Sequence, residues 1–450
     1  MNIVLPEDVT FIIDELNRNK FSGYVVGGAV RDSLIGRKVN DYDIATSAFP
    51  EDIQKIFPHN IPTGIKHGTV TVIVNGNPYE ITTFRVDGNY SDNRHPDNVQ
   101  FVSSLLDDLS RRDFTINAMA YNSQDGLIDP FNGIDDIENK IIRCVGNPDD
   151  RYVEDSLRMI RAIRFASELR FLIEENTLLA IAINRKLINN VSSERIRDEL
   201  NKIVESQTPF MGITLLRASR ILEYILPELN VCFSVDQNTS YHFTNVGMHT
   251  IFALQIVNSF HDKSDLAIRL AVLLHDIGKA VTKTTIDNVD HFYDHQFESA
   301  RMANDIMKKL KYDNNLIQEV ETLIVHHMDE ITPNKRVVKR FLNRLGYDML
   351  KKLIAVKSAD IGGQSMQYFD KRMNALNDVS LLIDEILEEK EVFSLKNLNI
   401  SGDDLIEIGF KQSPELGKTL NVLLEMVMDN PKLNNREYLL DEARLIYCGL

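Results

Sequence analysis

The 450-residue chain lacks the features that would tie it to a membrane, to an oxidising compartment or to a polyanion by bulk charge. Its cysteines, Cys144, Cys232 and Cys448, show neither metal-pair spacing nor a disulfide pattern, so we expect a reducing compartment, the cytoplasm. No apolar run reaches membrane-spanning length, and the first residues lack the basic and apolar segments of a signal peptide, so we expect neither export nor membrane insertion. The net charge of −16 means that a polyanionic partner must be met by local basic patches.

One such patch stands out between residues 335 and 352. It contains seven basic side chains against the single acid Asp348. We take the first four of them as candidate contacts to a polyanion, and a solvated helix face is the alternative; these four are Lys335, Arg336, Lys339 and Arg340.

The length of the chain predicts about three domains rather than one core. Short β-like runs alternate with turns over roughly the first 147 residues, and helical periodicity follows from about Tyr152 almost to the end. The predicted fold class is therefore α+β, with a small mixed sheet in an N-terminal head and an all-helical remainder. Breaks in the pattern predict four segments, which are residues 1–147, 148–240, 241–365 and 366–450.

A glycine turn and two aspartates mark a candidate nucleotide site in the head. Residues 27–32 read GGAVRD after a β-forming run, so Arg31 falls in the first turn of a predicted helix, where backbone N–H groups and a guanidinium both favour phosphate. Asp41 and Asp43 flank Tyr42, and the spacing predicts that both carboxylates share one face of a strand. Two hard oxygen ligands at that spacing suit Mg²⁺.

Seven motifs together resemble the class II tRNA nucleotidyltransferases, which are the CCA-adding enzymes and the related bacterial poly(A) polymerases. In chain order over about 210 residues these motifs are GGAVRD, DYD, TTFRVDGNYSDNRHP, RRDFTINAMAY, DPFNGIDDI, EDSLRMIRAIRFA and SSERIRDEL. The resemblance implies a nucleotidyltransferase-type head followed by a helical neck. It also implies that Asp41 and Asp43 hold catalytic Mg²⁺, while Gly28, Arg31 and Arg112 bind the triphosphate. Glu80, on a later predicted strand, stays outside this expected metal set.

Nucleotide choice is expected to lie in the neck, at Glu154 to Arg164. Asp155 and Arg158 are three residues apart on a predicted helix, which offers an acceptor and a donor side by side. Cytosine and adenine complement such a pair, whereas uracil and guanine do not. The resemblance extends the nucleotide-binding set to Arg161 and Arg164, although the helical rotation predicts that Arg164 reaches phosphate or a helix neighbour.

A histidine-rich region follows the neck. Eight of the 11 histidines lie between His242 and His327. Converging imidazoles and carboxylates make a divalent-metal site that activates water, and this region resembles an HD-type metal-dependent phosphohydrolase domain. The resemblance implies a ligand set of His249, His275, Asp276 and Asp360, which His295 and one of His326 or His327 would extend to a second metal.

The leading functional hypothesis is therefore template-independent addition of CMP, CMP and AMP to tRNA from CTP and ATP. The alternatives are a poly(A) polymerase, a CC-only or A-only enzyme, or an HD-type phosphohydrolase with an RNA-binding head. The same resemblance implies that an intact loop from Thr82 to Pro96 favours full CCA addition, since restricted relatives are expected to have it shortened, although His95 stands where the family pattern leads us to expect an arginine. We expect tRNA to be held through its backbone by neck arginines and the basic patch; the neck arginines are Arg151, Arg158, Arg170 and Arg185.

Overall fold

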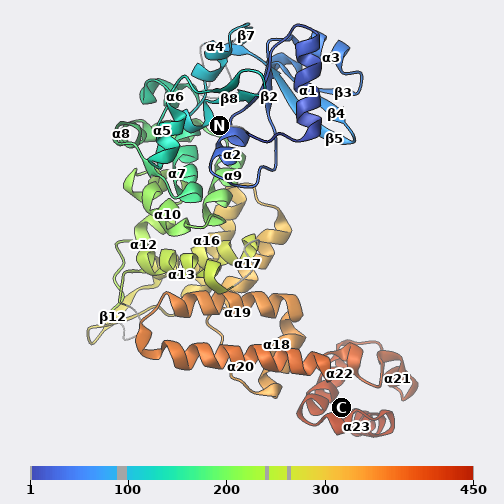
Figure 1. The fold of residues 1–450 in the computed structure, drawn as a ribbon. Coiled ribbons are helices and arrows are strands. Elements are labelled where there is room, and N and C mark those ends of the chain that lie inside the picture. The colour runs from blue at the N-terminus through green and yellow to red at the C-terminus, as the bar shows by residue number, and fades with distance from the viewer. Residues whose placement is uncertain (1–2, 89–98, 239–242, 261–264, 449–450) are drawn as a thin grey trace. The chain divides into compact units, whose positions relative to one another are not determined.

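The computed structural model describes residues 3–88, 99–238, 243–260 and 265–448. The chain forms two compact units, residues 1–230 and 231–450 (Figure 1). The finer division into four segments stays a prediction. None of the described helices combines the length and the apolar character that a membrane crossing requires.

The first unit is built on a seven-stranded mixed sheet of order β3-β4-β5-β2-β1-β8-β9. Neighbouring strands run antiparallel except for β2 and β5, which pair in parallel. The strands are β1 (Gly23–Val26), β2 (Ile44–Thr46), β3 (Asn60–Gly64), β4 (Thr69–Val74), β5 (Asn77–Thr83), β8 (Ala120–Asn122) and β9 (Gly126–Ile128). Two smaller pairs lie outside this sheet, β6 (Arg85–Asp87) with β7 (Val99–Phe101) and β10 (Ile141–Ile142) with β11 (Leu172–Ile173).

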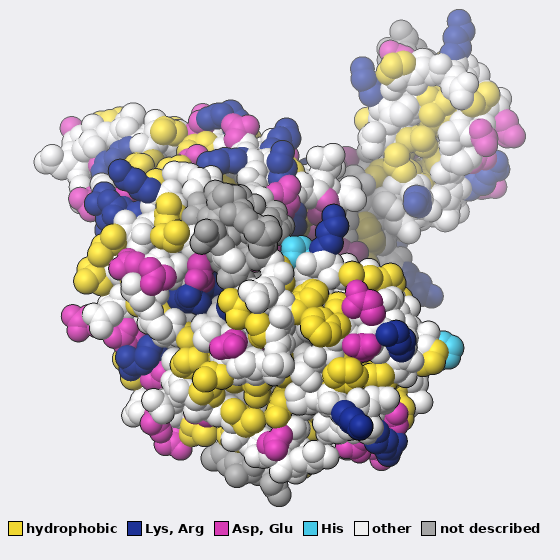
Figure 2. Space-filling view, turned by 90° about the horizontal axis from the view of Figure 1, so that it is seen from above, with side chains coloured by type: hydrophobic (Ala, Val, Ile, Leu, Met, Phe, Trp, Pro, Cys, Tyr) yellow, Lys and Arg dark blue, Asp and Glu magenta, His cyan; other side chains and the backbone are white. Residues whose placement is uncertain are grey.

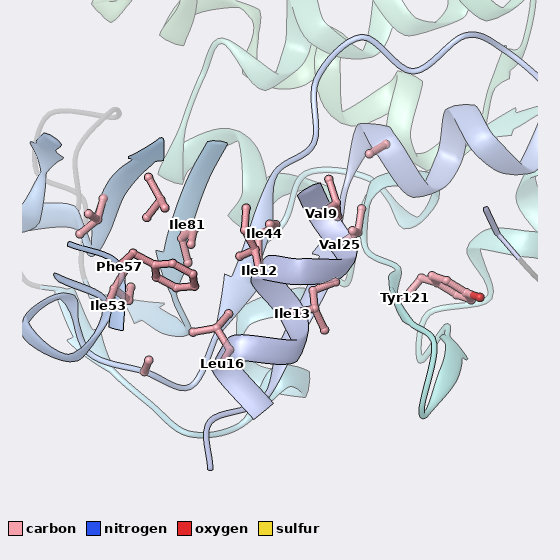
Figure 3. Close-up of a cluster of buried hydrophobic side chains, with 14 of the residues drawn as sticks. Val9, Ile12, Ile13, Leu16, Val25, Ile44, Ile53, Phe57, Ile81 and Tyr121 are labelled. Carbon is pink, nitrogen blue, oxygen red and sulfur yellow. The ribbon is translucent and has the colours of Figure 1, made fainter. Parts of the chain in front are cut away.

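Helix α1 (Glu7–Arg18) contributes the apolar stripe that closes one core of this unit. Val9, Ile12, Ile13 and Leu16 follow helical spacing and are all buried. Figure 3 shows these side chains directed toward residues of the sheet, among them Val25. Burying each such side chain contributes about 1.5–3 kcal/mol, so α1 anchors the head in which the candidate site lies.

The rest of the first unit is helical, with starts and stops that follow local chemistry. Asn147 caps α6 by accepting a hydrogen bond from the Asp149 N–H, and Pro148 occupies the first helical position. The remaining helices are α2 (Gly28–Leu34), α3 (Pro50–Ile56), α4 (Leu105–Ser110), α5 (Gly133–Glu138), α6 (Pro148–Glu154), α7 (Arg158–Leu169), α8 (Glu175–Asn184), α9 (Ser193–Val204), α10 (Pro209–Ala218), α11 (Leu222–Ile225) and α12 (Pro227–Cys232).

The second unit is almost entirely helical, as the sequence predicts. Asp265 and Asp313 cap α14 and α17 through their side chains. Its elements are α13 (Val246–Phe260), α14 (Leu266–Leu274), α15 (Lys279–Thr282), β12 (Thr284–Ile286), β13 (Val289–His291), α16 (His295–Lys309), α17 (Asn314–His326), α18 (Lys335–Leu345), α19 (Tyr347–Gly362), α20 (Phe369–Glu388), α21 (Gly402–Glu407), α22 (Pro414–Asp429) and α23 (Arg436–Cys448).

The mixed sheet followed by helices confirms the predicted α+β class. The last helices have a core of their own, with Leu405, Leu423 and Leu439 buried in it. Basic and acidic side chains are interspersed on the face shown in Figure 2.

Candidate functional site

Asp41 and Asp43 lie just before strand β2, which begins at Ile44. The expectation that both aspartates belong to the strand was wrong, because the buried run Ile44–Thr46 forms it and Asp is unfavourable in strands. The segment is nevertheless tied to the sheet, since the Asp43 carbonyl accepts a hydrogen bond from the Val26 N–H at 3.0 Å. Both aspartate side chains are exposed at this edge.

A third carboxylate joins these two through the sheet register. The parallel pairing of β2 with β5 aligns Ile44 with Ile81, so the preceding residues Asp43 and Glu80 are neighbours. Partial desolvation, Asp41 and Glu80 together raise the pKa of Asp43. From the sequence, Glu80 could equally be a third carboxylate or a simple edge-strand charge, and the register that places it beside Asp43 has no local signal.

The glycine turn brings two arginines close to the backbone. Gly27 has a φ of +69°, and a Cβ there would lie 3.0 Å from the Nη1 of Arg112. A Cβ on Gly28 would lie 3.6 Å from the Nη2 of Arg31, which is an ordinary contact. The strict demand for glycine therefore falls on Gly27, and Gly28 begins helix α2.

Both arginines are held in place by partners from the head. Arg31 is buried, and it donates to the Asn117 side-chain oxygen at 2.6 Å and to Asp32 at 2.9 Å. Arg112 donates to Asp108 at 3.2 Å. Both guanidiniums therefore lie beside the glycine turn, and these hydrogen bonds fix their orientations before any ligand binds.

Asp155 and Arg158 do not share a helix, which corrects the predicted helical pair. Helix α6 ends at Glu154, Asp155 has extended backbone angles, and Arg158 begins α7. The physical reason is local, because the Asp155 carboxylate accepts a hydrogen bond from the Leu157 N–H at 3.1 Å, an alternative to continuing the helix.

Each of these two side chains is instead positioned by other residues. Arg195 of α9 holds Asp155 in a bidentate pair, with N···O distances of 3.1 and 2.7 Å. Arg158 donates to Glu154 at 2.6 Å and to the carbonyl of Arg111 at 2.9 Å. Their roles in base choice stay a prediction.

Arg161 and Arg164 are enclosed by carboxylates of the same unit. Arg161 donates to Asp113 at 2.6 Å, and Arg164 lies 3.1 Å from Glu199. Burial lowers the pKa of Arg161, but Asp113 and Glu199 outweigh burial and raise it. Of the two predicted outcomes for Arg164, phosphate or a helix neighbour, the described contacts are with carboxylates, including Glu168 on its own helix at 3.9 Å.

The predicted HD residues converge inside the second unit. The Nε2 of His249 lies 3.0 Å from Asp360, and the Nε2 atoms of His275 and His295 each lie 3.3 Å from Asp276. All five residues are buried, with Asp360 the most exposed at 8%. Four separate helices or helix ends supply them, so the cluster exists only in the folded chain.

Backbone carbonyls fix which imidazole nitrogen faces the cluster. Four histidines, His327 included, each have their Nδ1 within 3.0 Å of a carbonyl oxygen, so the Nε2 of each ring is the nitrogen that faces the carboxylates. The pairs are His249 with Gly363, His275 with Val272, His295 with Phe292 and His327 with Ile324. Gly363 also allows this close approach, because a Cβ there would lie 3.0 Å from the Nδ1 of His249, which is tighter than an ordinary contact.

The structure also decides between the two adjacent histidines. His327 is buried with its Nε2 3.9 Å from Asp276, whereas His326 pairs with Asp329 at 2.9 Å. A cavity of about 470 Å³ opens beside the cluster. Besides carboxylates and imidazoles, the cavity is lined by three basic side chains, those of Lys279, Lys357 and Arg372.

The basic patch is not an open cationic surface, and its predicted role in RNA binding stays a prediction. Lys339 is only 2% exposed and is paired with Glu391, so it is closed to a macromolecular ligand. The other three members pair with carboxylates distant in sequence, which are Glu385, Glu389 and Glu391 for Lys335, Asp429 for Arg336, and Glu425 for Arg340. These acids follow their basic partners by 50 or more positions, so the local sequence gave no signal of the pairing.

The prediction based on the long loop falls largely outside the described part of the chain. Residues 89–98, which include His95 and Pro96, are not among the described residues. What the structure describes of this segment is the pair β6 and β7 at its two ends.

Comparison with known families and proteins places the chain. Residues 23–143 match the family described as the poly A polymerase head domain, residues 170–233 match a probable RNA- and SrmB-binding site of polymerase A, and residues 295–443 match a putative tRNA nucleotidyltransferase domain 2.

The similarity to individual proteins extends over the whole chain. A CCA-adding enzyme of Pediococcus pentosaceus is 35% identical over 97% of both chains, and one of Ligilactobacillus salivarius is 33% identical over 96% of this chain and 95% of the relative. The crystal structure of a Bacillus stearothermophilus CCA-adding enzyme in complex with CTP matches with a TM-score of 0.76 at 28% identity, covering 99% of this chain and all of the other. The chain therefore belongs to the CCA-adding enzyme family of nucleotidyltransferases.

Proposed function

We propose that this protein adds CMP, CMP and AMP in turn to the 3′ end of tRNA, using CTP and ATP and no nucleic-acid template. The observation that supports this most is similarity to CCA-adding enzymes over almost the entire chain. The carboxylates beside the Gly27 turn supply a site of matching chemistry in the head. We further propose a cytoplasmic location, in keeping with the buried free thiols of Cys144 and Cys232.

The three head carboxylates suit a hard divalent cation, for which we propose Mg²⁺. Asp41 and Asp43 are the ligands, and Glu80 stands beside them. Desolvation and the neighbouring charges of Asp41 and Glu80 raise the pKa of Asp43, and a cation bound among these oxygens offsets both effects. Such a cation, when bound, lowers the pKa of the primer hydroxyl and screens the charge of the phosphates.

The rest of the head site binds and orients the triphosphate. Gly27 lets the phosphates approach the backbone, and Arg31 and Arg112 meet them with charge-assisted hydrogen bonds. Because Asn117 and Asp108 already hold these guanidiniums, little ordering remains when the nucleotide binds.

Asp155 and Arg158 are the residues we propose for base selection. Asp155 accepts three described hydrogen bonds, fewer than the about four that a carboxylate can take, so it retains an acceptor for the amino group of cytosine or adenine. Arg158 donates three, fewer than the five of a guanidinium, and retains donors for the ring nitrogen. Uracil and guanine would leave both groups unpaired.

Product sizing tests this activity directly. Transcribed tRNA lacking its last three nucleotides is incubated with CTP alone, with ATP alone or with both. We expect two added nucleotides, none and three, respectively. Long extension with ATP alone would show a poly(A) polymerase, and a stop after two nucleotides with both substrates would show a CC-only enzyme.

The histidine cluster supports a second function, hydrolysis of phosphate esters by a resident divalent metal. The Nε2 atoms of His275 and His295 are buried without a well-aligned hydrogen bond, which fits metal ligation. Burial lowers the pKa of His275, but Asp276 outweighs burial and raises it to about 10, so the site attracts positive charge. A metal held by these residues would supply an activated water. Manganese-dependent release of nitrophenol from p-nitrophenyl phosphate would support this function, and none with a metal-loaded protein would refute it.

A further inference from the structure

Phe165 lies at the meeting point of three arginines in the first unit. Its ring is buried on α7, with 4% of the residue exposed. The guanidinium carbons of Arg164, Arg31 and Arg161 lie 4.1, 4.9 and 5.4 Å from the ring centroid. These distances are within the range of cation–π attraction, which is strongest at desolvated sites. Arg31 comes from α2, so the ring joins two elements far apart in sequence.

The ring itself is held in a fixed orientation. Phe114 packs against Phe165 with centroids 5.8 Å apart and ring planes at 84°, an edge-to-face pair. Phe114 is fully buried and follows directly after Asp113, the carboxylate that binds Arg161. The aromatic pair therefore belongs to the same packed region as the arginines, and rotation of Phe165 would disturb both.

An aromatic ring can gather cations without neutralising them. Each of the three guanidiniums already has a carboxylate partner, which is Asp32 for Arg31, Asp113 for Arg161 and Glu199 for Arg164, and a further carboxylate would cancel another positive charge. The ring attracts each guanidinium through its quadrupole and leaves the net charge unchanged. The ring therefore holds the three arginines together without adding a further negative charge to those that already pair with them.

We propose that Phe165 is a positioning residue for the nucleoside triphosphate. It keeps Arg31, together with Arg161 and Arg164, in the arrangement that meets the phosphates, and it does so without touching the nucleotide. The inference rests on the proposed function, since it assumes that these arginines bind the triphosphate of CTP or ATP.

Loss of the ring should therefore weaken binding according to the number of phosphates. For Phe165→Leu we expect the Kd for CTP and for ATP to rise about tenfold, with a smaller rise for CDP and almost none for CMP. Phe165→Tyr retains the ring, and its Kd for CTP should stay within about threefold of the parent. Isothermal titration calorimetry of the full chain measures these affinities.

Phe57→Leu is the matched control, because Phe57 is similarly buried, at 5% against 4% for Phe165, but packs mostly among aliphatic side chains of the core that α1 closes. We expect it to leave the CTP affinity unchanged. Phe165→Met is the second ring-free variant if Phe165→Leu does not fold by circular dichroism. Equal weakening for CMP and CTP in the ring-free variant would indicate general damage and would overturn the inference.

Arg31→Ala separates this inference from the proposed function. If Arg31→Ala weakens CTP binding but neither ring-free variant does, the inference about Phe165 fails and the triphosphate site stands. If Arg31→Ala also leaves CTP binding unchanged, the triphosphate site is wrongly placed, whereas the proposed function itself is decided by product sizing.

Discussion

The carboxylates of the head and the histidine cluster of the second unit are built in opposite ways. Asp41 and Asp43 are exposed at a sheet edge, whereas the cluster residues are at most 8% exposed. An exposed carboxylate pair is stabilised by water, so it needs no bound cation until a substrate arrives and supplies the remaining metal ligands. A buried carboxylate needs compensating charge at all times. The first arrangement suits a metal that arrives with its nucleotide, and the second suits a metal that stays.

The two regions also differ in how their basic residues are used. In the head and neck, arginines hold partners and still keep donors for a ligand, as the contacts of Arg158 show. In the second unit, the basic side chains of the patch form ion pairs with carboxylates of the same unit, as Lys339 does with Glu391. A local count of charges therefore says little about which cations a ligand can reach.

The strongest test of the comparison removes the head carboxylates. Asp41→Ala/Asp43→Ala should lower nucleotide addition to tRNA by about a thousandfold or more, because the ligands of the metal are lost. Rates of CMP incorporation measure this. Metal bound at the histidine cluster, measured by mass spectrometry, should stay at the parental level. Addition at the parental rate by the folded double variant would show that the carboxylates are not the catalytic centre.

The converse experiment removes the central carboxylate of the cluster. Asp276→Asn should weaken metal binding by about 100-fold and leave the rate of CCA addition unchanged, because Asp276 lies within hydrogen-bonding reach of two cluster imidazoles. Metal content after dialysis is the readout. His326→Ala is the matched control, since His326 pairs with Asp329 outside the cluster. Equal metal loss in both variants would contradict the assignment of ligands.

A smaller effect is expected from the base-selecting pair. Asp155→Ala should reduce the preference for CTP over UTP by about 10–100-fold, since an unpaired partner no longer penalises the wrong base. The ratio of kcat/KM values for the two nucleotides measures it. Asp150→Ala is a suitable control, because that side chain is exposed one turn earlier on α6. An unchanged ratio for Asp155→Ala would refute the proposed template.

The smallest effect concerns the basic patch. Replacing Lys335, Arg336 and Arg340 together by alanine should change tRNA affinity by less than about twofold, because their charges are already paired with carboxylates. Filter binding at several salt concentrations measures both the affinity and its salt slope. A marked fall in affinity and slope would show that RNA displaces these ion pairs and would support the role predicted from sequence.

Sequence reasoning reached the site residues that sit in contiguous motifs. The head carboxylates and the glycine turn, and the HD residues His249, His275, Asp276, His295 and Asp360, were all named in advance, and the structure brings each group together. The errors arose where a rule about neighbouring residues was applied to a side chain whose partner is distant in the sequence. Helical spacing predicted that Asp155 and Arg158 are neighbours. Instead, the helix breaks between these two residues, and Asp155 forms an ion pair with Arg195, which lies 40 positions away.

The sequence by itself determined which chemical groups this protein carries and the order of its α+β elements, because motifs and periodicity are local properties of the chain. Only the tertiary structure decided that Glu80 joins the aspartates, that His327 rather than His326 enters the cluster, and that the basic patch is neutralised. The physical reason is that strand register, burial and ion pairing depend on residues that are far apart in the chain and meet only when it folds.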